Sequence, residues 1–229
     1  MTTDAASAQP TAPPPRRVLL LAGCYADAGP AIGLAAALAQ RMQAALEGVL
    51  ALDPRAEAAE GATLVVAGRA RGAVLALDRE RLTLAYAADA RAFRSRLDAT
   101  AARLAIRWSF RTDTGALPDL ALGLRQPGDA VVLGHRRFLP LRGPVLALED
   151  SAEGAPESAA DGPAARLAAD LARALGLRAR RLPADTPAAA LEPLAISALV
   201  LPHSIQSDPA RLAALIEAAR CPVLLSPAS

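Results

Sequence analysis

The chain has 229 residues, of which 53% are hydrophobic and 3% aromatic, and its formal net charge at pH 7 is +2. A chain of this length and apolar content can form one large domain or two small ones and bury a core. The small net charge and the few aromatic residues argue against nucleic-acid binding, which uses a clustered basic face or stacking rings. We therefore expect a globular protein that does not bind nucleic acid.

The N-terminal residues 1–15 predict a disordered tail. They are rich in Ala, Pro, Ser and Thr, and they lack the basic start and apolar centre of a signal peptide. The longest apolar stretch, residues 18–38, carries Asp27 and Pro30 in its middle and is too polar there to span a membrane. Cys24 and Cys221 fit a reducing compartment, where structural disulfides are rare. We expect a cytoplasmic protein without membrane insertion.

After the tail, expected strands and helices alternate. Residues 18–22 are a continuous apolar run typical of a buried parallel strand. Pro30 marks the expected start of a helix with an apolar stripe, since proline is harmless in a first helical turn. Residues 49–52 predict a second strand. Residues 53–76 are expected to be an irregular connection.

A long helix is expected from Asp78, which can cap its start, to about residue 105. Alternating steps of four and three give it one core stripe, made of Leu82, Tyr86, Ala90, Phe93, Leu97, Ala101 and Leu104. A strand at 107–111, a short helix at 116–124 and a strand at 131–133 are expected to follow. This last strand ends beside His135.

The pattern then restarts with an expected strand at 144–148. The sequence GPAARLAADLARAL from Gly162 matches eight of fourteen positions of GPAIGLAAALAQRM from Gly29. DTGA at Asp113 and DTPA at Asp185 each precede a short helix and an apolar strand that ends near a histidine. Asp208 can cap a helix at 209–220, and a last strand follows at 222–225. These repeats predict a diverged duplication with parallel α/β sheets.

The order of elements and the segments CPVLLSP, LDRERL, RWSFR and AVVLG resemble the universal stress protein family in its tandem form. The resemblance covers nearly the whole chain after the tail. It implies two tandem flavodoxin-like or Rossmann-like repeats, residues 16–140 and a shorter 141–229. It also implies a stress-linked binding or regulatory role for an unknown protein or small-molecule ligand. Edge strands of the family pair across a dimer, so the two halves could form an internal pseudo-dimer, and two chains a homodimer.

ATP-binding members of this family carry an acid after the first strand, in a pattern like V-D-x-S, and a loop G-x-x-G-x9-G-[S/T] after the fourth. Glycines let backbone N–H groups reach phosphate, and a helix start favours its charge. In the first half, Ala22 stands in the acid position and is followed by Gly23 and Cys24. The loop begins with Gly134, but Arg137 replaces its second glycine.

The second half departs from the family pattern in the opposite way. Glu149 can take the acid position and Ser151 the serine position, whereas Pro202 and His203 stand where the loop should begin. The resemblance therefore implies incomplete nucleotide sites and no bound cofactor. Binding of ATP or AMP through a non-standard loop at 134–137 stays the alternative.

His135 and His203 both follow apolar strands, where open α/β sheets bind ligands. Each imidazole is either a binding group that responds to pH near neutrality or a cap on a turn. Arg136 and Arg137 could hold an anion or form a solvated turn. Two histidines are too few ligands for a metal site, so none is expected.

The sequence contains no complete catalytic constellation. Cys24 follows the first strand near a helix start that could lower its thiol pKa, or it is an inert buried thiol. Neither Ser151 nor Ser204 lies in a G-x-S-x-G elbow. We therefore expect a protein that is not an enzyme.

Overall fold

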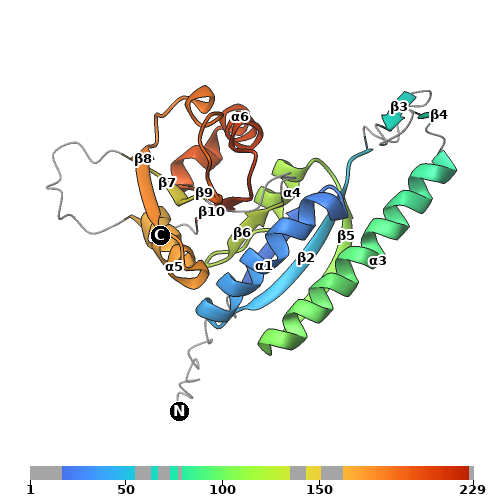
Figure 1. Ribbon diagram of the computed structural model, residues 1–229, viewed down its shortest axis with the longest axis horizontal. Helices are drawn as coiled ribbons and strands as arrows, with labels where there is room; N and C mark the ends of the chain where they lie inside the picture. The colour runs from blue at the N-terminus through green and yellow to red at the C-terminus, as the bar shows by residue number, and fades with distance from the viewer. Residues whose placement is uncertain are drawn as a thin grey trace, which may run out of the picture.

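The computed structural model describes residues 17–54, 63–66, 73–76, 79–134, 143–150 and 162–226. Their elements form a mixed α/β structure around one eight-stranded, mostly parallel sheet (Figure 1). The α/β class and the parallel pairing predicted from the sequence are confirmed. The tail at 1–15 and Asp78 lie outside the described residues.

The first half of the chain supplies four strands of this sheet and a separate two-stranded hairpin. Its elements in chain order are β1 (Arg17–Ala22), α1 (Tyr25–Met42), β2 (Ala45–Leu52), β3 (Thr63–Val66), β4 (Ala73–Ala76), α3 (Arg79–Leu104), β5 (Trp108–Thr114), α4 (Leu117–Gly123) and β6 (Ala130–Leu133).

The second half supplies the other four strands. Its elements are β7 (Val145–Glu149), α5 (Pro163–Leu175), β8 (Ala179–Pro183), the 3-10 helix η1 (Ala188–Ala190), β9 (Ala198–Leu201), the 3-10 helix η2 (His203–Ser207), α6 (Pro209–Ala219) and β10 (Val223–Leu225).

The strand order is β5-β2-β1-β6-β10-β9-β7-β8, so the two halves meet where β6 lies beside β10. This pair is antiparallel, with Leu224 opposite Val132, whereas neighbouring strands within each half are parallel. The sheet direction therefore reverses at this seam. We call the end of the sheet where β1, β2, β5 and β6 finish the first carboxyl end, and the opposite end, where β7 to β10 finish, the second carboxyl end.

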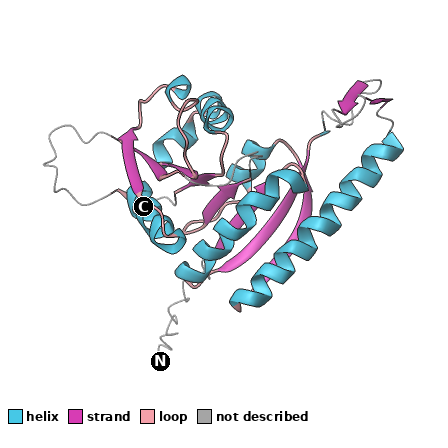
Figure 2. Ribbon diagram, viewed as in Figure 1, coloured by secondary structure: helices cyan, strands magenta, loops and turns pink. Residues whose placement is uncertain are grey.

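Helices α1, α3 and α5 cover one face of the sheet, and α4 and α6 cover the other (Figure 2). The apolar run of β1 serves both faces: Val18 and Leu20 pack under α1, while Leu19 and Leu21 face the opposite layer. A strand covered on both faces must be apolar throughout, which is why this run predicted a buried parallel strand. Helices α1 and α5 contact each other across the seam.

The start of α1 differs from the prediction. The helix begins at Tyr25, and Pro30 lies inside it. The backbone N–H of Ala28 already donates to the carbonyl of Cys24 at 3.1 Å, so the first turn forms before the proline. Asp27 in this first turn stabilises the positive end of the helix dipole.

The connection predicted to be irregular at 53–76 contains the antiparallel strands β3 and β4. Their sequences, TLVV and AVLA, contain the β-branched residues that favour strands. The prediction also omitted β8, which pairs only with β7. Its sequence ARRLP is mostly exposed at the edge of the sheet and lacks the apolar run of a central strand.

The long helix is confirmed as α3. The predicted stripe residues Phe93, Leu97 and Ala101 are fully buried, whereas Tyr86, nearer the start of the helix, is only half-buried. Figure 1 shows the reason: the N-terminal part of α3 extends past the sheet toward the β3–β4 hairpin.

Candidate functional site

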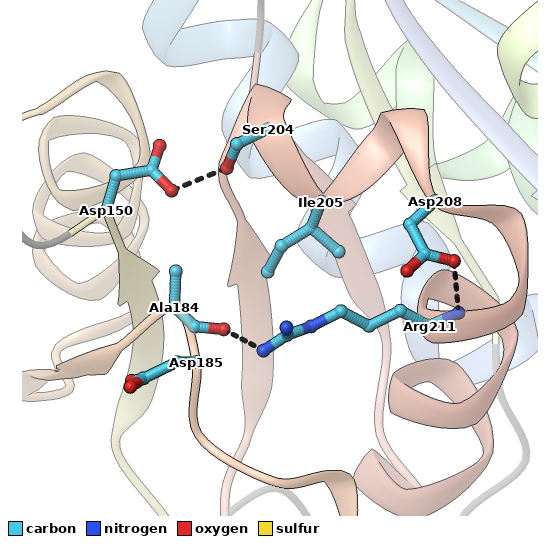
Figure 3. A pocket seen from close by; sticks show the side chains of 7 residues that line it. All are labelled: Asp150, Ala184, Asp185, Ser204, Ile205, Asp208 and Arg211. Atoms are coloured by element: carbon cyan, nitrogen blue, oxygen red, sulfur yellow. Dashed lines mark hydrogen bonds between the residues drawn. The ribbon is translucent and has the colours of Figure 1, made fainter.

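Two cavities lie beside the helix η2, and the larger of these two, of about 480 Å³, is at the second carboxyl end (Figure 3). In open α/β sheets, ligands bind outside the carboxyl ends of the strands. The loops after β7 and β8, the helix η2 and the start of α6 all contribute to its lining, which consists of Asp150, Ala184, Asp185, Ser204, Ile205, Asp208 and Arg211.

Hydrogen bonds join the walls of this cavity (Figure 3). The hydroxyl of Ser204 donates to Asp150 Oδ1 at 2.6 Å, although the two residues are 54 positions apart. The guanidinium of Arg211 donates to the carbonyl of Ala184. Asp208 caps α6, as predicted, by accepting from the Arg211 backbone N–H at 3.0 Å. The cavity thus combines carboxylates with a single arginine that is already engaged.

The helix η2 also contributes to a second cavity, of about 350 Å³, which we call the seam cavity. Its lining comes from both halves: Leu122, Arg125, Gln126 and Pro127 precede β6, and His203, Gln206 and Ser207 follow β9. Within it, Arg125 donates to Gln206 Oε1 and, at 2.7 Å, to the carbonyl of Ser226. Gln206 Nε2 donates to the same carbonyl at 3.2 Å. These bonds tie the loop before β6 to the carboxyl ends of β9 and β10.

The first carboxyl end is closely packed where the nucleotide loop was expected to begin. The N–H of Gly134 donates to the carbonyl of Leu21 at 2.7 Å. A Cβ at this position would lie 2.8 Å from the Asp27 carbonyl oxygen and 3.0 Å from Ala22 Cβ. Close approach of the chain to α1 therefore requires glycine here, whether or not a phosphate binds.

Cys24 is half-buried just before α1. Burial raises the pKa of its thiol, and a backbone hydrogen bond from Asp27 acts in the opposite direction. The negative charge of Asp27 raises the pKa further. Of the two alternatives for Cys24, the raised pKa favours the inert thiol, because desolvation of the thiolate outweighs the neighbouring helix start.

The second-half candidates that the structure describes do not share one cavity. Glu149 lies on the α5 side of the sheet with Ala147, and its carboxylate is 3.7 Å from Arg181 Nη1. His203 is exposed and lines the seam cavity. Neither residue lines the larger cavity.

The residues predicted from the sequence are thus divided between opposite ends of the sheet. Gly23, Cys24 and Gly134 lie at the first carboxyl end, and Glu149 and His203 at the second. The remaining candidates lie outside the described residues: His135, Arg136, Arg137 and Ser151.

Sequence reasoning gave no binding role to Asp150, Ser204 or Arg211. Asp150 and Ser204 could have been identified as binding candidates, because each is a polar residue shortly after the end of a buried strand. Arg211 could not, since an arginine in an amphipathic helix usually faces solvent.

Within the described ranges, no group of three or more His, Cys, Asp or Glu side chains could hold a metal ion. Among the same residues, no helix has both the length and the apolar character needed to cross a membrane.

No protein-family model matches this chain, and neither does any curated protein. A solved universal stress protein from Archaeoglobus fulgidus DSM 4304 is similar with a TM-score of 0.43 and 8% identity, over 92% of this chain and 96% of its own. A solved protein of the universal stress protein family from Burkholderia pseudomallei is similar with a TM-score of 0.33 and 17% identity, over 96% of this chain and 100% of its own. At such low similarity, what this chain binds has to be inferred from its own residues.

Proposed function

We propose that this chain is a non-enzymatic cytoplasmic module of the universal stress protein type, with a binding or regulatory role. The observation that carries the proposal is the cavity of about 480 Å³ at the second carboxyl end. Its volume lies in the range of small-molecule sites, and its position is the usual one for ligands in parallel sheets.

The strand order supports a tandem organisation, with halves at 16–140 and 141–229. One of the common strand orders of doubly wound sheets, counted along the chain, begins 3-2-1-4-5. The first-half order β5-β2-β1-β6 fits 3-2-1-4. The second-half order β8-β7-β9-β10 fits 2-1-4-5, with the third strand absent. In this interpretation β10 occupies the position beside β6 that a fifth strand of the first half would take, and the chain forms an internal pseudo-dimer.

The charges around the larger cavity support a degenerate nucleotide site. Asp150, Asp185 and Asp208 would repel the phosphates of a nucleotide. Arg211 is the one basic residue among the described residues of the lining, and its guanidinium already binds Ala184. The Asp208 carboxylate itself occupies the start of α6, where a phosphate could otherwise bind. A neutral or cationic small molecule, or a neutral or cationic protein segment, fits this lining better than a nucleotide does.

A binding role fits the lining better than catalysis. Ser204 donates to Asp150, but the described residues of the lining include no histidine that could act as a general base between them. At the first carboxyl end, the raised pKa of Cys24 keeps its thiol neutral and weakens it as a nucleophile.

Adenine-nucleotide binding at the first carboxyl end is the second candidate function. The observation that favours it is the contact between Gly134 and the first turn of α1 at Asp27, because helix starts favour phosphate. It predicts that millimolar ATP or AMP raises the melting temperature of the protein, and an unchanged melting temperature would exclude it.

The experiment that tests the first proposal is a native mass spectrum of protein purified gently from its own host. We expect a bound small molecule or partner on the wild type that is lost from the double variant D150A/S204A. The variant R166A is the control, since Arg166 is exposed on α5, outside the cavity lining. A mass without any bound species, or equal retention by D150A/S204A, would contradict the proposal, and a bound adenine nucleotide would establish the alternative.

A further inference from the structure

The seam cavity holds the half-buried positive charge of Arg125, and none of the described carboxylates contacts it. Within the described region, Arg125 hydrogen-bonds only to neutral acceptors, namely the side chain of Gln206 and the carbonyl of Ser226. Burying a charged group is costly unless an opposite charge compensates it. The burial of Arg125 is strong enough to lower its pKa, although an arginine stays protonated at neutral pH.

The carboxylate of Asp129, which attracts Arg125 through space, is bonded to other groups. Its Oδ2 accepts from Arg17 Nε and from the Gln126 backbone N–H, both at 2.8 Å. Arg17 also binds Glu47 at 2.8 Å, so Asp129 belongs to a separate charge network. The positive charge of Arg125 is therefore available to a ligand.

The rest of the seam-cavity lining favours an anion. The described residues of this lining include no carboxylate, in contrast to those of the larger cavity. A guanidinium has five N–H donors, and acceptors in the described part of the chain take two of those of Arg125. His203, exposed on the same lining, adds a ring N–H donor. Leu122 and Pro127 supply apolar surface beside these polar groups.

We propose that the seam cavity binds an oxyanion carried on an apolar body, of the chemistry of a phosphate monoester or a carboxylate. Arg125 and His203 bind the anionic group, and Leu122 and Pro127 contact the apolar body. A volume of about 350 Å³ is sufficient for a small molecule of this kind. Because residues of both halves line the cavity, a bound anion also stabilises the pairing of β6 with β10.

Isothermal titration calorimetry with phenyl phosphate tests this proposal. We expect saturable binding to the wild type, a loss of about tenfold or more in R125M, and a smaller loss in H203A, because each variant removes a donor to a charged group. R166A should bind like the wild type, since it removes an arginine from outside the cavity. Benzoate is the second probe: the tighter of the two ligands identifies the preferred oxyanion.

Two further measurements keep the result interpretable. Arg125 ties the two halves together, so circular dichroism must show that R125M is folded, whereas the exposed His203 can be replaced without loss of core contacts. D150A/S204A should bind phenyl phosphate like the wild type, which separates this site from the larger cavity. Absence of heat with both probes at millimolar concentration, or unchanged affinity in both R125M and H203A, would overturn the proposal.

Discussion

Gly33 and Gly134 both belong to the first half, but their surroundings differ. A Cβ at Gly33, on the exposed side of α1, would meet nothing within 4 Å, whereas one at Gly134 would lie 2.8 Å from the Asp27 carbonyl oxygen. We expect G33A to stabilise the protein by about 0.5–1 kcal/mol, because alanine loses less backbone entropy in a helix. G134A should destabilise it by about 1–3 kcal/mol through overpacking. Urea unfolding followed by circular dichroism measures both, and a stabilising G134A would contradict the close packing at the first carboxyl end.

Cys24 should react slowly with alkylating reagents. Because burial raises its thiol pKa, the thiolate fraction at neutral pH is smaller than that of a free cysteine, and the reaction rate should rise only at higher pH. We expect a pH midpoint for iodoacetamide alkylation above that of glutathione, measured by peptide mass spectrometry. In D27N the midpoint should move down, since the Asp27 charge raises this pKa. A wild-type midpoint below that of glutathione would restore the reactive-thiol hypothesis.

The candidate residues illustrate what the sequence could predict. Cys24, Gly134 and Glu149 were found at strand ends because a buried apolar run has a visible limit. The hydrogen bond between Ser204 and Asp150 and the contacts of Arg125 could not be found in this way. They join loops from different strands, and only the order of those strands brings them together.

Helices and strands were predictable to the extent that burial leaves a pattern in the sequence. The stripe of α3 has the helical period, and β1 and β9 are continuous apolar runs because both of their faces are covered. The exposed edge strand β8 has neither pattern. The position of Pro30 predicts a later start for α1 than the structure has. Asp27 in the preceding turn favours the earlier start at Tyr25, because an acid stabilises the first turn of a helix.

The capping of α6 provides a prediction at this scale. Asp208 accepts from the Arg211 backbone N–H, so D208A leaves a helix-terminal donor without its partner. We expect a loss of about 1 kcal/mol in the free energy of unfolding, and a much smaller loss in D208N, since asparagine is an equally good N-cap. Chemical denaturation of the two variants side by side is the measurement. An equal loss in both would show that the negative charge, not the cap, is what matters.

At the scale of the whole molecule, the antiparallel seam determines which residues can act together. Because the sheet reverses between β6 and β10, Gly134, just after β6, and Glu149, the last residue of β7, lie at opposite ends of the sheet. The sequence indicates two similar halves but not their relative direction, since pairing between distant strands leaves no local pattern. A single site that combines Gly134 of the first half with Glu149 of the second is therefore excluded. The seam cavity, in contrast, forms only because the sheet direction reverses.

The same seam predicts that the two halves depend on each other for folding. Separation would leave β6 paired only with β1 and β10 only with β9, and it would expose Val132 and Leu224, which are fully buried. Unpaired apolar edges favour aggregation. We expect fragments 1–140 and 141–229 to be insoluble or unfolded when expressed alone, and to co-purify as a folded complex when expressed together with a tag on one of them. The intact chain should unfold in a single transition. If each fragment alone unfolded cooperatively at the midpoint of the intact protein, the halves would be independent domains and the seam would contribute little to stability.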